Sequence, residues 1–475
     1  MIARHAADRR RTRPPADFLF MDYSGAFDLS MKELHIDTDM ENNVLYSGAF
    51  VATLPFMLVA GWALLRGYDW SACLAMSALI VLAGWLRWAA VVVGSYALAV
   101  VSTGLVGVAG GVIFTMFTFL PARWFPEGER GLATSLAVQA TYAGWALGAL
   151  IPIVLGSGGD EHAQVVNDET FLLAQAIVAS VLLPLHFVAN RRGPLHAGAG
   201  GAAPTAAAAI AAATVTTTDG GDGDDGGVGK TLCLLATRPQ YVVHSCCYAV
   251  LGGVGYAVGG AVDECFGGIL TDDAVGVAHP TMWLTFVFIV AGVVAGLILG
   301  AAVPDRPRAQ AVALRTLFAA AAASLVTISV LLALETPDAD APADAPAAPP
   351  PPPSAAPAVG GSGLTKPQLY AVLFALFVVA GVGTVGFIGI GLRVAVAISR
   401  PADETYAGGT VEFILLVVGT VLGIGTSFNT ARFGFWWFSA PAAAAAVALF
   451  AGARFHDKGR RTVDDALLAA AVGGA

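Results

Sequence analysis

The chain has 475 residues, of which 56% are apolar and only 12% are charged, and its mean hydropathy is +0.71. A soluble globular domain carries about 25% charged residues, so this composition excludes an ordinary soluble domain and indicates a chain solvated mostly by a lipid bilayer. The formal net charge is −9, and we expect no nucleic-acid partner.

Apolar runs of about 20 residues recur along the chain, and each is long enough to cross a hydrocarbon core of roughly 30 Å as a helix. No alternating pattern of a β-barrel is present. A further, degenerate candidate lies at 16–31 and contains Asp17, Asp22 and Asp28. The eleven clear predicted spans are 47–66, 71–93, 95–120, 131–156, 169–190, 239–262, 281–303, 312–334, 367–396, 407–428 and 433–455.

The distribution of Lys and Arg predicts the orientation of these spans. If the N-terminus is cytosolic and residues 16–31 cross once, most of the 25 Lys and Arg residues fall on the cytosolic side, including those of the leader RHAADRRRTR. Only Lys32, Lys366 and Arg432 then lie in exofacial loops. This agreement with the positive-inside rule predicts cytosolic N- and C-termini and a first helix that is short or incomplete in this chain.

Two low-complexity segments divide the sequence. Residues 191–237, rich in Gly, Ala, Thr and Asp, are predicted to form a disordered cytosolic linker, and the Pro- and Ala-rich residues 337–364 an exofacial loop. We therefore predict an N-terminal bundle at 1–190, a C-terminal bundle at 238–455 and a cytosolic tail at 456–475. Six crossings, a long linker and six crossings are typical of the all-α membrane fold of the major facilitator superfamily.

The stretch LPARWFPEGERGLATSLA places four charges between two apolar spans. One interpretation is a solvated cytosolic turn that serves as a topology signal. The other is an inner gate whose ion pairs break when the bundles rock, with the two acids pairing with the two arginines. The residues concerned are Arg123, Glu127, Glu129 and Arg130.

Three spans contain further candidate residues. Thr141, Tyr142 and Trp145 follow one another closely near the middle of the predicted span 131–156. Aromatic residues in a span usually contact lipid or pack against other helices, and a patch facing a cavity is the alternative for these three. Arg87 lies deep in the span 71–93, where a charge costs about 2.5–3.5 kcal/mol on insertion scales. It therefore requires a partner or water, and we expect it to support the packing of the N-terminal bundle.

The spans 239–262 and 407–428 add an aromatic residue and carboxylates. Tyr256 is in the middle of its glycine-rich span, Asp263 and Glu264 are two turns further toward the exofacial side, and Glu412 has substantial membrane depth. Aromatic faces and carboxylates together suit an organic cation. Packing or interfacial roles are the alternative for Glu412.

Several strings resemble the FLVCR-related transporters, which are related to the feline leukaemia virus subgroup C receptor and form solute carrier family 49. LPARWFPEGERGLATSLA, GWLRW, YAVLGGVGYAVGGAVDE and GFIGIGLRVAVAISRPADETYAGGTVEF are similar to motifs of that family. The resemblance implies transport of choline or ethanolamine, or of haem. It also implies an aromatic choline site with a tyrosine of the seventh span, which Tyr256 matches, and a tryptophan of the first span, which in this sequence is either missing or replaced by Phe20 or Tyr23.

The sequence departs from that family at other implied site positions. Tyr142 and Leu416 occupy the positions of two glutamines, Glu412 the position of an asparagine, and Asp263 with Glu264 an asparagine–glutamine pair. The expected site is therefore more aromatic and more acidic. Tyr256, Tyr142, Trp145, Glu412, Asp263 and Glu264 are our candidate substrate-binding residues for an organic cation.

Two alternatives to an organic-cation transporter are left open. One is export of haem, for which His244 is a weak candidate ligand, and the other is a non-transporting membrane receptor or scaffold. An enzyme is not expected, because no nucleophile–base pair is evident, and the five cysteines lack metal-binding spacing. The string GGVGKT lacks the first glycine of a P-loop, since position 224 is Asp. We expect no cofactor and no metal.

Overall fold

The computed structural model describes residues 39–155, 161–190, 226–266, 269–304, 306–335, 362–400, 402 and 404–452, and every element in these ranges is helical. The predicted first span at 16–31 with Phe20 and Tyr23, residues 191–225 of the predicted linker and residues 337–361 of the Pro-rich segment lie outside the described residues.

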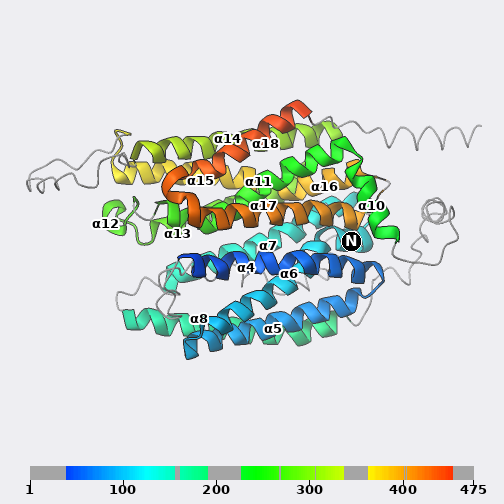
Figure 1. Ribbon diagram of the computed structural model, residues 1–475, viewed down its shortest axis with the longest axis horizontal. Helices are drawn as coiled ribbons and strands as arrows, with labels where there is room; N and C mark the ends of the chain where they lie inside the picture. The colour runs from blue at the N-terminus through cyan, green and yellow to red at the C-terminus, as the bar shows by residue number, and fades with distance from the viewer. Residues whose placement is uncertain are drawn as a thin grey trace, which may run out of the picture.

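The N-terminal half forms one group of helices, in the lower part of Figure 1. Helices α4 and α6 pack together, as do α5 and α6, and α5 and α8. A Cβ added at Gly107 would lie 2.2 Å from the carbonyl oxygen of Ala49, so α6 approaches the backbone of α4 directly. The helices are α4 (Asp39–Leu65), α5 (Asp69–Val93), α6 (Tyr96–Trp124), α7 (Glu127–Leu155) and α8 (Glu161–Asn190).

The C-terminal half forms the second group, in the upper part of Figure 1. Helix α11 packs against α17 and α18, and α15 packs between α13 and α14. A Cβ at Gly381 would lie 1.9 Å from the carbonyl oxygen of Phe288, which explains how α13 and α15 come into backbone contact. The helices are α11 (Pro239–Phe266), α12 (Asp272–Val275), α13 (Pro280–Ala302), α14 (Pro307–Glu335), α15 (Lys366–Thr384), α16 (Ile388–Ser399), α17 (Glu404–Phe433) and α18 (Trp436–Gly452).

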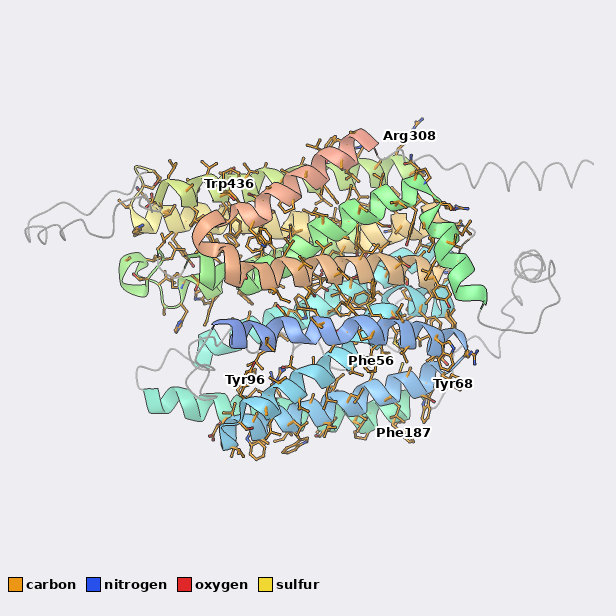
Figure 2. The ribbon with its side chains drawn as sticks, viewed as in Figure 1. Phe56, Tyr68, Tyr96, Phe187, Arg308 and Trp436 are labelled. Atoms are coloured by element: carbon orange, nitrogen blue, oxygen red, sulfur yellow. The ribbon has the colours of Figure 1, made fainter. Side chains whose placement is uncertain are left out.

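Many outward-facing side chains are apolar, as membrane helices require. Phe56, Tyr68 and Trp436, labelled in Figure 2, are each more than a third exposed. Within the described residues, eight helical segments are long and apolar enough to cross a membrane, and Glu169–Leu185 and Trp436–Gly452 are shorter apolar helices. Together they describe a multi-pass integral membrane protein.

The predicted single span at 367–396 is interrupted. Helix α15 ends at Thr384 and α16 begins at Ile388, and the amides of Val385 and Gly386 both bond to the carbonyl of Gly381. The break leaves the carbonyl of Val385 accessible to another helix, and the side-chain amide of Gln139 on α7 donates to it at 3.4 Å. Glycines around the break weaken the regular helix, and a polar side chain of the other bundle satisfies the interrupted backbone.

The predicted linker at 191–237 also differs from expectation at its end, because Gly226–Ala236 forms helix α10. The string TLCLLA ends this segment, and Leu235 is 1% exposed within the core that includes α11. Burial of this apolar turn offsets the entropy of ordering it, which the Gly- and Asp-rich composition of the preceding residues did not suggest.

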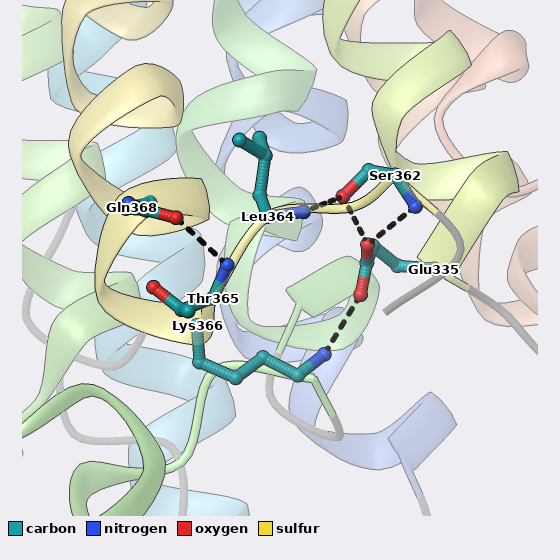
Figure 3. Close-up of polar contacts among 6 residues, drawn as sticks. All are labelled: Glu335, Ser362, Leu364, Thr365, Lys366 and Gln368. Atoms are coloured by element: carbon teal, nitrogen blue, oxygen red, sulfur yellow. Dashed lines mark hydrogen bonds and ion pairs between the residues drawn. The ribbon is translucent and has the colours of Figure 1, made fainter. Parts of the chain in front are cut away.

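A polar clasp joins the helices on either side of the Pro-rich segment (Figure 3). Glu335, whose side chain is 1% exposed, accepts hydrogen bonds from the amide and hydroxyl of Ser362 and forms an ion pair with Lys366 at 3.0 Å. Thr365 and Gln368 form a capping box at the start of α15. The clasp therefore holds the end of α14 beside the start of α15.

Candidate functional site

The two bundles meet along α4, α6 and α7 on one side and α13, α16 and α17 on the other. Small residues permit this close contact. Cβ atoms added at Gly296 and Gly300 of α13 would lie 2.1 Å and 2.4 Å from the side chains of Gln139 and Ser135 on α7. At these positions, polar side chains of the N-terminal bundle pack directly against glycines of the C-terminal bundle.

A cluster of five aromatic rings occupies this interface, and we call it the central aromatic cluster. Four rings come from α4, α6 and α7, and the fifth, Tyr256, comes from α11 of the C-terminal bundle. Every ring is almost fully buried. The cluster consists of Phe50, Phe114, Tyr142, Trp145 and Tyr256.

Tyr256 is the centre of the cluster. Its ring centroid lies 4.6 Å from that of Trp145, 5.4 Å from that of Phe50, 5.8 Å from that of Tyr142 and 6.4 Å from that of Phe114. The contact with Trp145 is edge-to-face at 90°, a favourable arrangement of two aromatic rings. A movement of one bundle relative to the other would therefore pull Tyr256 away from four partners at once.

Glu412 lies beside this cluster, on α17, with 1% of its surface exposed. Its Oε1 accepts a hydrogen bond of 2.5 Å from the hydroxyl of Tyr248 on α11. The ring of Tyr248 packs against Phe387 at 5.1 Å and occupies the space left by the missing side chain of Gly391. A Cβ added at Gly419 of α17 would lie 3.2 Å from Cβ of Tyr256, so α17 passes beside Tyr256 as well.

The sequence predicted some of these residues and missed others. The structure brings the predicted Tyr142, Trp145 and Tyr256 together, next to the predicted Glu412, whereas Phe50, Phe114 and Tyr248 were missed. Tyr248 precedes Tyr256 by eight residues, a spacing that places both on one face of a helix, and this signal could have identified it. Asp263 and Glu264 lie in the last turns of α11, and their side chains are outside the described residues.

The ring of His244, a weak haem-ligand candidate, is also buried on α11. Its Nε2 contacts the carbonyl oxygen of Gly391 at 2.9 Å. This hydrogen bond ties α11 to the start of α16, one turn before the Tyr248 ring packs against the same glycine. This contact favours a structural role for His244, and its part in binding haem stays a prediction.

Arg87 is 1% exposed on α5, which agrees with its predicted depth. The neighbouring Gly84 meets the backbone of Ala176 on α8, so this part of α5 is packed within the N-terminal bundle and not at the interface between the bundles. Its contribution to that packing stays a prediction.

The charged stretch at 123–130 forms ion pairs with acids on other helices. Arg130 forms an ion pair with Glu404 of α17 at 3.2 Å, and Arg123 forms one with Asp69 of α5 at 3.8 Å. Glu129 is exposed and the side chain of Glu127 lies outside the described residues. Packing brings the ends of distant helices together here, so the arginines reach acids far away in sequence.

Reversing the charges of the Arg130–Glu404 pair tests whether it holds this end of the bundles closed. We expect Arg130→Glu to lower the thermal stability in detergent, because Glu404 then faces a like charge. The double variant Arg130→Glu/Glu404→Arg should recover part of this loss, since the exchanged pair can form again although Glu404→Arg also removes the contact with Arg400. We expect a coupling energy of about 0.2–1 kcal/mol for a partly exposed pair. Strictly additive losses in the four-variant cycle would show that the pair does not join the bundles.

Comparison with protein-family models gives no match, and no curated protein sequence matches significantly. Solved structures do match in fold. A D-xylose–proton symporter is 13% identical, with a TM-score of 0.60 over 94% of this chain and 97% of that chain. The fucose:proton symporter of E. coli is 13% identical, with a TM-score of 0.53 over 93% and 96%.

A third structure is a major facilitator superfamily proton:xylose symporter bound to 6-bromo-6-deoxy-D-glucose. It is 13% identical, with a TM-score of 0.60 over 93% of this chain and 94% of that chain. Similarity at this level of identity concerns the fold alone, and it extends over almost the full length of each chain. The chain therefore has the fold of the major facilitator superfamily.

Proposed function

We propose that this protein is a secondary transporter that moves a small organic cation, such as choline or ethanolamine, by alternating access between its two bundles. The observation that supports this most strongly is the position of Tyr256. Its ring comes from the C-terminal bundle and packs against four aromatic rings of the N-terminal bundle, beside the buried carboxyl group of Glu412.

The chemistry of this site favours a cation. Aromatic faces attract ammonium groups by about 0.5–2 kcal/mol per ring, most strongly where water is excluded. An ionisable residue inside a membrane bundle is by default a functional candidate, and Glu412 can balance one positive charge. Asp263 and Glu264, near the predicted exofacial side of α11, are proposed to attract the cation before it enters.

The interface position of the cluster suits alternating access. In this fold the substrate site lies near the membrane midplane between two bundles that rock about it. The described aromatic rings are packed against one another, so entry of a cation requires Tyr256 to separate from Trp145 and its other partners. The Arg130–Glu404 pair is proposed to close the predicted cytosolic side while the site is open to the other side.

Uptake of radiolabelled choline into cells that express the chain tests this function. We expect uptake above that of mock-transfected cells at matched surface expression, with inhibition by excess ethanolamine. Excess D-xylose should have no effect, since the site has the chemistry for an ammonium group and not for a neutral sugar. Well-expressed protein that takes up no choline, or whose uptake is inhibited by D-xylose but not by ethanolamine, would overturn the proposal.

A further inference from the structure

The carboxyl group of Glu412 has one described hydrogen-bond partner and no described counter-charge. Tyr248 donates to its Oε1, and 1% of the residue is exposed. Among the described residues, no ion pair includes Glu412. A buried carboxylate without a counter-charge is strongly disfavoured, so the site requires a positive charge that the described residues do not supply.

The titratable groups on the helices around α17 do not supply this charge. The groups on α11 and α7 include tyrosine hydroxyls and one imidazole, and none of these carries a permanent positive charge. Arg130 and Arg400 contact Glu404, which is eight residues before Glu412 and thus about 12 Å away along the helix. The guanidinium of Arg393 on α16 lies against Gly131 of α7, and none of the ion pairs among the described residues joins it to Glu412. Neither α4 nor α18 presents a described titratable side chain. The described titratable groups on these helices are Glu129, Arg130 and Tyr142 of α7, Tyr241, His244, Cys246, Cys247, Tyr248, Tyr256 and Cys265 of α11, Tyr96 and Arg123 of α6, Arg393 of α16, Cys233 of α10, and Glu404 and Tyr406 of α17.

Two species can supply the missing charge, and they exclude one another. A proton bound to the carboxyl group neutralises it, and so does a monovalent cation held against the carboxylate and the neighbouring ring of Tyr256. We propose that Glu412 binds a proton and the organic cation alternately, so that the protein exchanges one proton for one monovalent cation. This inference rests on the proposed function and adds the coupling ion and the stoichiometry of that same site.

The exchange balances in charge and in protons. When the cation enters from one side, the proton on Glu412 leaves to water on that side, and the ion pair of carboxylate and cation crosses. After the cation leaves on the other side, a proton from that side binds the same carboxyl group and crosses back. The hydroxyl of Tyr248 donates its hydrogen bond to the carboxyl oxygen in both states and holds it in position.

Purified protein in liposomes separates the inference from the function on which it rests. Counterflow, in which external labelled choline exchanges for internal unlabelled choline without a pH gradient, measures transport alone. An inside-acidic gradient imposed on vesicles without internal choline measures coupling. For a one-for-one exchange, a gradient of about 2 pH units can drive about 100-fold accumulation. A membrane potential imposed with potassium and valinomycin should have no effect.

Glu412→Gln keeps the hydrogen bond to Tyr248 and removes both the negative charge and the proton site. We expect this variant to lose gradient-driven accumulation and the pH dependence of any counterflow that persists. Glu169→Gln, at a partly exposed position on α8, is the matched control and should behave like the wild type.

Each other outcome contradicts a defined part of the account. Wild-type counterflow that is insensitive to the pH gradient, or accumulation driven by the membrane potential, would overturn the exchange and leave the transport function standing. Gradient-driven accumulation by Glu412→Gln would assign the proton to another group and also overturn the inference. The absence of counterflow by folded wild-type protein would overturn both.

Discussion

Replacing Tyr256 by alanine is expected to abolish choline transport at unchanged surface expression. The substitution removes the one ring that the C-terminal bundle contributes to the central aromatic cluster. A desolvated cation–π contact of about 2 kcal/mol corresponds to about a 30-fold loss of affinity, and the cavity left between the bundles adds to it.

Two further variants distinguish the ring from its hydroxyl and from general damage. Tyr256→Phe keeps the aromatic face, so we expect its KM for choline to stay within about 3-fold of the wild type, a change below about 1 kcal/mol. Tyr68→Ala removes an exposed tyrosine at the turn between α4 and α5 and should leave uptake unchanged. Equal uptake by Tyr256→Ala and the wild type would place the substrate elsewhere.

A methyl group added at Gly391 is expected to disturb the site through the ring of Tyr248. Its Cβ would lie 2.5 Å from Cδ2 of Tyr248, so the ring must shift and its hydrogen bond to Glu412 must lengthen or break. Overpacking of this kind costs about 1–3 kcal/mol, and we expect Gly391→Ala to lower both the unfolding temperature in detergent and choline uptake.

The matched control for Gly391→Ala is Gly409→Ala on α17, where a Cβ would meet no atom within 4 Å and alanine favours the helix. The double variant Gly391→Ala/Tyr248→Ala removes the clash, so its stability loss should be smaller than the sum of the single losses. Additive losses, or normal uptake by Gly391→Ala, would show that the position of Tyr248 does not depend on this glycine.

Membrane depth and helix period were readable from the sequence because both are local. Apolar runs of about 20 residues predicted the eight described segments that are long and apolar enough to cross a membrane, and Tyr256 lies in the one at Pro239–Val262. The same pattern did not reveal the break between α15 and α16. Its amides and carbonyls are satisfied by turn hydrogen bonds and by Gln139 of another helix, which no local pattern encodes.

The sequence did not show which residues of different helices contact one another. Phe50 and Phe114 look like any other phenylalanine in a membrane helix, since lipid and protein interior are equally apolar, and only packing distinguishes them. Arg130 has a partner in Glu404, which is 274 residues away in sequence. The partner of Glu412, Tyr248, is 164 residues away.

The central claim is that the cation binds between Tyr256 and its partners, and a structure of the protein at saturating choline tests it most directly. We predict density for the quaternary ammonium group within about 6 Å of the Tyr256 and Trp145 ring centroids, next to the carboxyl group of Glu412. Choline density at another place, with these two rings still in edge-to-face contact, would contradict the account.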